Sequence, residues 1–166
     1  MLRRDAAALA VLSLAAAAAL GGERSALEFA RHGEAVATLD RAALEEIAPP
    51  RRVRVFEPYE EAEARFEALP FADVLDHVYG PSWREEEELL FTCRDGYQPT
   101  VPVQRVLAHT AWLAVDRPGE RGFTIEKRES GRLRRVDLSP AYLIWDNLGD
   151  ARVREEGDYG WPYQLV

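Results

Sequence analysis

The sequence predicts a strand-rich α+β domain, with a mixed sheet and short helices. Brief extended stretches recur along the chain, in which apolar residues alternate with charged ones or form short buried runs. Between them lie short helical patterns that end at Pro or Gly, and after residue 22 no internal repeat or low-complexity linker interrupts the sequence. A chain of 166 residues can bury one substantial core, so we expect a single main domain.

Charge and cysteine content exclude several classes of function. The chain carries 21 Lys and Arg against 29 Asp and Glu, a net charge of −8, which argues against a nucleic-acid partner. Its single cysteine excludes an intramolecular disulfide and a zinc site of the paired-cysteine type. Because no C-x-x-C-H motif occurs, we also expect no covalently attached haem.

Residues 1–22 have the anatomy of a secretory signal peptide. A short positive start precedes the apolar run Ala6–Leu20, and small residues near its end offer cleavage sites. Fifteen residues are too few for a membrane span, which needs about 20, so we expect no stable span after cleavage and a periplasmic or secreted protein. The alternative is a buried N-terminal helix. The pair Arg3-Arg4 weakly resembles a twin-arginine signal, which leaves the export route open between that and the general secretory one.

Two helices are expected between residues 39 and 79. Residues 23–48 are predicted to form an N-terminal segment with one short helix, which Asp40 can cap and the prolines at 49–50 end. The apolar residues that share one face of that helix are Leu39, Leu44 and Ile47. A second helix is expected over Phe71–Tyr79, ended by Gly80-Pro81.

Residues 49–166 form the predicted main domain, and most of its elements are strands. The alternating or continuous apolar stretches that predict them are Arg52–Glu57, Leu89–Cys93, Val101–Val103, Ala111–Val115, Phe123–Glu126, Leu133–Leu138, Tyr142–Trp145 and Trp161–Val166. The turn residues at 117–120 predict that the two stretches on either side of them form a hairpin. The acidic run Glu85–Glu88 is expected to be a solvated edge.

The lone thiol stands in the most informative stretch of the sequence. Cys93 ends a predicted buried strand, Arg94 follows it, and Asp95-Gly96 supplies a turn. A neighbouring cation favours the thiolate, which is the form that binds soft metals. The alternative is a buried thiol with no ligand, because free Cys is among the most buried residue types. The residues by themselves favour this alternative.

The segment from Cys93 to Pro102 resembles the cofactor loop of the sulfite-oxidase-type molybdopterin oxidoreductases. Downstream, Ser139–Ile144 resembles that family's G-x-P-L-R-L-V strand and Tyr159–Tyr163 its G-x-x-W segment. The chain is most similar to small periplasmic domains of this fold, some of which precede a c-type cytochrome domain. The motifs that carry this likeness are C-x-D-G-Y-x-P at 93–99, W-D-N at 145–147 and W-P-Y at 161–163.

The resemblance implies a molybdopterin cofactor, a fold and a set of site residues. Cys93 would ligate molybdenum, Val103–His109 would be a short helix, and a c-type cytochrome would be the redox partner. The residues expected to contact the cofactor are Cys93, Arg94, Asp95, Gly96, Tyr97 and Tyr142. The chain departs from the pattern at Tyr142, where the larger enzymes have arginine, and their phosphate-binding and dimerisation segments have no counterpart. In the cytochrome-linked proteins of this group the chain continues past the position that corresponds to Val166, so we expect a truncated or split reading frame.

Two hypotheses follow from the resemblance. In the first, the domain is an oxidoreductase that transfers oxygen atoms at a molybdenum bound by Cys93 and passes electrons to a periplasmic cytochrome. In the second, the same fold has lost its cofactor and docks a c-type cytochrome. The missing arginine favours the second hypothesis, and the retained cysteine favours the first.

The remaining candidate residues carry weaker signals. The three histidines, His32, His77 and His109, show no metal-ligand spacing, and His77 is expected on a helix surface. Asp146-Asn147 is consistent with a ligand contact or with a turn that closes a strand. Trp161 and Tyr163 alternate along the chain, which suits either core packing or a partner surface.

Overall fold

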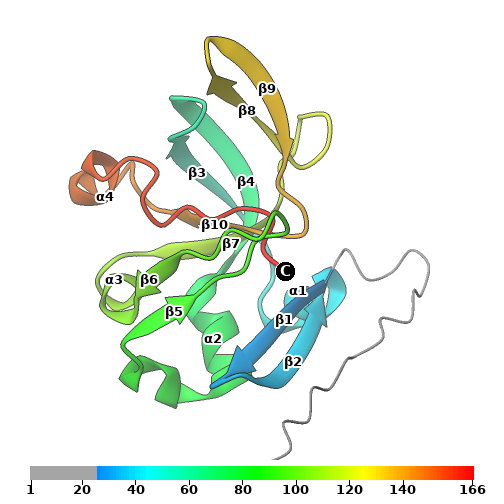
Figure 1. Ribbon diagram of the computed structural model, residues 1–166, viewed down its shortest axis with the longest axis vertical. Coiled ribbons are helices and arrows are strands. Elements are labelled where there is room, and N and C mark those ends of the chain that lie inside the picture. Colours follow the sequence, from blue (N-terminus) through cyan, green and yellow to red (C-terminus); the bar gives the residue numbers. More distant parts are fainter. Residues whose placement is uncertain (1–25) are drawn as a thin grey trace, which may run out of the picture.

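The computed structural model describes residues 26–166, so the signal peptide predicted over residues 1–22 lies outside the described part. It is a strand-rich α+β structure with short helices, as predicted (Figure 1). The strands are β1 (Ala26–Arg31), β2 (Glu34–Asp40), β3 (Arg51–Glu57), β4 (Ala62–Pro70), β5 (Glu88–Leu90), β6 (Thr100–Pro102), β7 (Ala111–Asp116), β8 (Thr124–Glu129), β9 (Arg132–Asp137) and β10 (Tyr142–Trp145). The helices are α1 (Arg41–Ile47), α2 (Phe71–Tyr79), the 3₁₀ helix η1 (Pro81–Glu85), α3 (Val103–Ala108) and α4 (Ala151–Glu155).

The main sheet has four strands in the order β10-β7-β4-β3 and curls into a half-barrel (Figure 1). Its three ladders are antiparallel, and so are those of the two-stranded sheets β1-β2, β5-β6 and β8-β9. The predicted mixed sheet is therefore wrong for the described residues. An irregularity in the β4–β7 register between Glu67 and Ala68 adds local twist and bending, which favours the curl.

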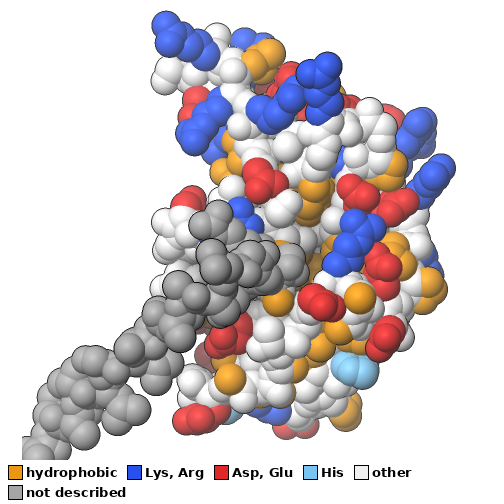
Figure 2. Space-filling view, turned by 90° about the vertical axis from the view of Figure 1, so that its right-hand side faces the viewer, with side chains coloured by type: hydrophobic (Ala, Val, Ile, Leu, Met, Phe, Trp, Pro, Cys, Tyr) orange, Lys and Arg blue, Asp and Glu red, His pale blue; other side chains and the backbone are white. Residues whose placement is uncertain are grey.

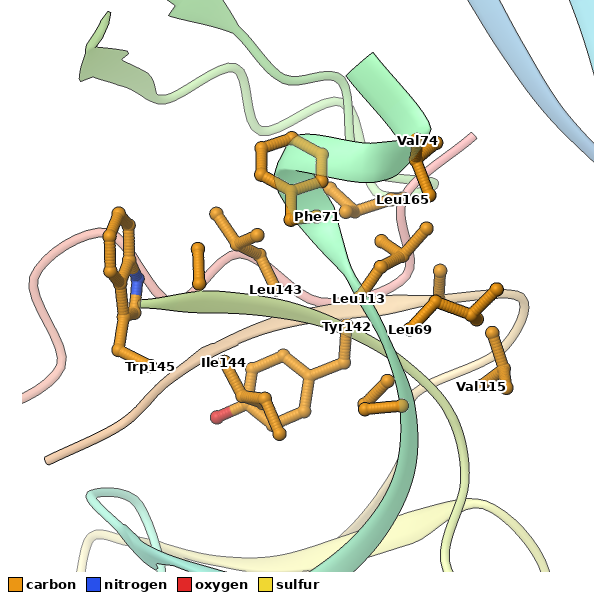
Figure 3. Packing of buried hydrophobic residues seen from close by; sticks show 14 of the residues in the cluster. Leu69, Phe71, Val74, Leu113, Val115, Tyr142, Leu143, Ile144, Trp145 and Leu165 are labelled. Atoms are coloured by element: carbon orange, nitrogen blue, oxygen red, sulfur yellow. The ribbon is translucent and has the colours of Figure 1, made fainter. Parts of the chain in front are cut away.

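The core lies on both faces of this sheet (Figure 3). Leu143 and Leu113 pack on one face beneath the α2 residue Phe71, whereas Tyr142 and Ile144 point to the opposite face. All four residues of β10 are buried. Because successive side chains of a strand point to opposite faces, β10 contributes to both halves of the core.

The two edge strands of the sheet are joined by side chains across the open side of the half-barrel. The Asn147 side chain, just after β10, donates to the carbonyl of Phe56 on β3 (2.7 Å) and accepts from its N–H (2.8 Å). The Tyr142 hydroxyl donates to Glu57, the last residue of β3 (2.7 Å). These contacts close the curl that the three ladders begin.

The helix predictions hold because their signals are local. Helix α2 spans the predicted residues and ends at Gly80, whose φ of 66° suits glycine. Asp40 caps α1 as expected, since its carboxylate accepts from the N–H of Ala43 (2.9 Å). Helix α3 covers most of the range that the resemblance implied. Leu39, however, lies in β2, because the segment before Asp40 forms the hairpin β1–β2, which the sequence analysis missed.

Strand pairing departs from the predictions. The expected hairpin across residues 117–120 does not form: β7 pairs with β4 and β10, and β8 pairs with β9. The hairpin that does form, β8–β9, turns at Ser130 and Gly131. Both residues have positive φ, which a two-residue turn needs in order to match the twist of its strands. This hairpin projects from one end of the molecule (Figure 1), where Lys and Arg side chains gather (Figure 2).

Two predicted buried strands are shorter or absent. β5 covers only three residues, and Leu90 is 63% exposed, so the run that leads to Cys93 is not a buried strand. The segment Trp161–Val166 forms two isolated bridges, Tyr142↔Tyr163 and Cys93↔Leu165, in place of a strand. It still protects the outer edge of β10, where the N–H of Leu143 donates to the carbonyl of Pro162 (3.0 Å). No helix among residues 26–166 is long and apolar enough to cross a membrane.

The Asn147 contact can be tested by mutation. Asn147→Ala leaves the N–H and the carbonyl of Phe56 without their partner at a buried position, so we expect the free energy of unfolding to fall by about 2–4 kcal/mol. Asp146→Ala is the matched control, because it removes only one partly exposed hydrogen bond to Gly149, with an expected cost of about 1 kcal/mol. Urea unfolding measures both values, and equal costs for the two variants would contradict the assigned role of Asn147.

Candidate functional site

The loop that contains Cys93 is a tight turn held by its own main chain. The N–H of Cys93 donates to the carbonyl of Tyr97 (2.9 Å), and the N–H of Gly96 donates to the carbonyl of Cys93 (2.8 Å). The Asp95 carboxylate accepts from the N–H of Tyr97 (3.0 Å), and Gly96 has a φ of 87°. The Asp-Gly turn predicted here is confirmed, with glycine at the position that needs positive φ.

The same loop is attached to the C-terminal segment that covers β10. The N–H of Arg94 donates to the carbonyl of Gln164 (2.9 Å), and the N–H of Val166 donates to the carbonyl of Thr92 (3.1 Å). These two bonds flank the isolated bridge between Cys93 and Leu165. Cys93 therefore sits where two irregular segments are paired, and both segments supply backbone partners to each other.

The thiol itself is buried and protonated at neutral pH. Cys93 is 4% exposed, and burial together with the negative charge of Asp95 raises the pKa of the thiol to about 11. The Arg94 guanidinium donates to the carbonyl of Ser139 (2.7 Å) and lies 3.4 Å from the Asp137 carboxylate. The expectation that Arg94 favours the thiolate is therefore wrong, because desolvation determines the direction of the shift.

The predicted cofactor-contacting residues do not converge on one site. Arg94, Asp95, Gly96 and Tyr97 lie on the exposed surface of the turn, where Tyr97 is 63% exposed. Tyr142 is fully buried and its hydroxyl is bonded to Glu57. Figure 3 shows Tyr142 on the opposite side of the sheet from Leu165, the bridge partner of Cys93.

A buried carboxylate that the sequence analysis missed lies beside Tyr142. Glu57 has no exposed surface and accepts from the Tyr142 hydroxyl (2.7 Å) and from the N–H of Glu60 (2.6 Å). Burial raises the pKa of Glu57, and these two hydrogen bonds oppose the rise. The available signal was its position in β3, where Glu57 continues the inward alternation of Val53 and Val55.

A second, ionised carboxylate completes this cluster. Glu60 accepts from both terminal nitrogens of Arg117 (2.7 Å each) and from the N–H of Glu126 (2.7 Å). Burial raises the pKa of Glu60, but these hydrogen bonds and the charge of Arg117 together lower it below the usual value. Arg117 also donates to the carbonyl of Thr124 (2.9 Å). We call Glu57, Glu60, Arg117 and Tyr142 the half-barrel cluster; it links β3, β7, β8 and β10.

The W-D-N and W-P-Y motifs also serve packing. The Trp145 indole N–H donates to the carbonyl of Gly160 (2.6 Å), and Trp161 is 1% exposed. Tyr163 packs edge-on against Tyr59 with ring centroids 5.6 Å apart. Of the two alternatives for Asp146-Asn147, the turn is observed, and Asn147 is fully engaged with β3.

Two of the three histidines lie beside carboxylates. His109 Nδ1 contacts the carboxylate of Asp150, and His32 Nε2 lies 3.6 Å from Glu86. His77 is exposed on α2, as predicted. Within residues 26–166, no group of three or more His, Cys, Asp or Glu side chains is arranged to hold a metal ion.

A groove of the described surface is lined by none of the predicted site residues. This groove, of about 1150 Å³, lies between the β1–β2 hairpin, α2 and β5. Its floor is apolar, and Cys93, Tyr97 and Tyr142 are not among its lining residues. We call the apolar lining residues Leu27, Phe29, Phe71, Leu75, Trp83 and Leu113 the floor of the groove. This size exceeds the usual range of small-molecule pockets, about 300–1,000 Å³.

Comparison of the sequence with models of known protein families finds no match, and a search of curated proteins finds none either.

The half-barrel cluster predicts a defined pH dependence. Because the pKa of Glu57 is raised above its usual 4.5, the folded chain binds this proton more tightly than the unfolded chain does. Its contribution to stability is therefore full below about pH 4.5 and is lost as the pH rises through the raised pKa. In Glu57→Gln this fall should disappear, as measured by urea unfolding at a series of pH values.

Glu60→Gln is the control, because the contribution of Glu60 to stability should change with pH in the opposite direction. The lowered pKa of Glu60 means that its carboxylate stabilises the fold above the unfolded pKa and that this stability is lost as the pH falls. The Glu60→Gln variant should therefore lose most stability at neutral pH and little in acid. Superimposable pH profiles of the parent protein and Glu57→Gln would contradict the assigned state of Glu57.

Proposed function

We propose that this chain is an exported, cofactor-free binding module of the sulfite-oxidase-like molybdopterin-binding fold, whose partner is a c-type cytochrome. One observation favours it over the enzyme hypothesis: the Cys93 thiol is 4% exposed and lies at the bridge between its loop and the C-terminal segment. The resemblance of the three sequence motifs supports the fold, and the cytochrome-linked relatives support the partner class. The signal-like residues 1–22 support export.

The residues present do not fit a molybdopterin cofactor. A metal ligand must be a thiolate that the metal can reach, whereas Cys93 is 4% exposed. A pterin phosphate needs converging donors or a helix N-terminus. Arg94, the cation nearest along the chain, donates to the carbonyl of Ser139 and is paired with Asp137. We therefore derive no redox step from this site.

The same contacts suit a structural role for Cys93. Its loop and the C-terminal segment exchange backbone hydrogen bonds on both sides of the bridge to Leu165. A small apolar side chain fits between them without a polar partner. The motif that resembles a cofactor loop would thus be retained because it holds the segment that covers β10.

Metal analysis distinguishes the two hypotheses. We expect protein exported by its native host, or by a host that makes molybdopterin, to contain no stoichiometric molybdenum and to show the same metal content after Cys93→Ala. Elemental analysis of the purified protein measures this, and circular dichroism confirms that the variant is folded. One molybdenum per chain that is lost on Cys93→Ala would overturn the proposal.

The partner class has its own readout. Immobilised protein should retain a c-type cytochrome from the periplasm of the native host, identified by its haem absorbance. Retention should weaken as the salt concentration rises if surface charges contribute. If no haem protein is retained while the immobilised domain remains folded, the cytochrome assignment is wrong.

A further inference from the structure

We propose that the groove between β1 and β5 binds an extended segment of a partner protein as an added β-strand, with apolar and basic side chains in alternation. The inference rests on the proposed binding function and gives it a surface and a recognition chemistry. It requires two free strand edges, an apolar floor and acidic flanks, each of which the described residues supply.

Both walls of the groove are strand edges. Among residues 26–166, β1 pairs with β2 alone and β5 pairs with β6 alone, so each has one edge without a neighbouring strand. The groove is lined by unbroken runs of residues, 26–33 on one side and 88–92 on the other. Successive side chains alternate between faces, so a wall made of consecutive residues is the edge of a strand. Such edges are templates for another chain.

The end of β1 is attached to α2 and to the segment that leads into β5. Arg31, at the end of β1, donates to the Glu86 carboxylate (2.6 Å) and to the hydroxyl of Ser82 (2.8 Å). The Tyr79 hydroxyl donates to the carbonyl of Ala30 (3.0 Å). From this attachment β1 and β5 run in opposite directions on either side of the groove (Figure 1). An inserted strand would be antiparallel to one wall and parallel to the other, which joins the two small sheets into one of five strands.

The floor of the groove determines half of the segment's side chains. Leu27 and Phe29 of β1 are buried beside Phe71 and Leu75 of α2, and Trp83 of η1 is 2% exposed. An extended segment would point every second side chain towards this floor. Residues i, i+2 and i+4 of the segment should therefore be apolar.

The exposed residues of β1 and β5 determine which outward-pointing side chains the segment should carry. Glu28 on β1 and Glu88 on β5 are both exposed and both line the groove. The outward side chains of an inserted strand would lie between these two carboxylates, within reach of cross-strand pairing. Opposite charges across strands are favourable and like charges are not, so Lys or Arg is expected at the outward position of the segment that lies beside these two carboxylates.

The probe is a set of fluorescein-labelled hexapeptides. Their three inward positions are filled by Val, Ile, Leu or Phe in all combinations, and the other three are Lys. Fluorescence anisotropy measures binding, and we expect members with Kd below about 1 mM. The control with the same composition places the apolar residues in one block. A second control methylates the backbone nitrogens of the best binder, which removes its N–H donors and should weaken binding at least about tenfold.

Protein variants locate the site. Glu88→Lys should weaken the best peptide by about five- to tenfold, because the exposed charge beside the groove is reversed. Glu46→Lys makes the same change at an exposed position of α1 outside the groove and should alter Kd by less than about twofold. Hydrogen exchange should show new protection in both 26–31 and 88–90 when the peptide is bound.

Each other occupant predicts a different result. Equal binding of the methylated or block peptide would show an apolar ligand site and overturn strand addition. Protection of both strands that depends on protein concentration without peptide would identify a second copy of this chain as the occupant. Absence of binding across the whole set would also overturn the inference. None of these outcomes bears on the molybdenum measurement, so the two proposals fail separately.

Discussion

The fold depends on one constraint: β3 and β10, at opposite edges of a four-stranded sheet, must meet across its open side. The three antiparallel ladders of the sheet do not join these two edges by themselves. Tyr142 and Asn147 make the closure, through Glu57 and the backbone of Phe56. The glutamate is costly to bury unless it is hydrogen-bonded or protonated, which explains why its pKa is raised and why Tyr142 donates to it. A network of this kind specifies one arrangement of the sheet when every member is satisfied.

This closure also explains the three motifs that resemble a cofactor domain. W-D-N supplies β10's last residue and Asn147, W-P-Y supplies the segment that covers the outer edge of β10, and the Cys93 turn holds the end of that segment. In each case the observed partner is another part of the chain. The contacts of all three motifs are therefore accounted for by packing, and the surface that we propose for recognition is the groove between β1 and β5.

How much the sequence predicted depended on the range of each signal. Helix α2 was predicted at its observed bounds, because a helical repeat and the Gly80 stop both lie within ten residues. The pairing of β7 was wrong, because a turn signal at 117–120 is local whereas the partners of β7 are β4 and β10. Glu57 was missed for the same reason: a charged residue in a strand indicates solvent unless its partner is known, and Tyr142 lies 85 positions away. The Asp-Gly turn after Cys93 was predicted correctly, but the buried strand before it was not observed. The pKa of the thiol depends on its burial in the folded chain, which residue spacing does not encode.

The claim that Cys93 is a buried structural thiol is tested most directly by its alkylation rate. The chain has one cysteine, so iodoacetamide incorporation reports a single group. With a pKa raised from 9.0 to about 11, the thiolate population at about pH 8 should be about a hundredfold smaller in the native protein than in the urea-unfolded chain, and burial slows the reaction further. If Cys93 is a buried structural thiol, the unfolded chain should be alkylated at least about a hundredfold faster than the native protein at about pH 8. Alkylation of the native protein should rise steeply as the pH approaches 11. Native alkylation at about pH 8 as fast as in urea would show an accessible thiolate and contradict the account.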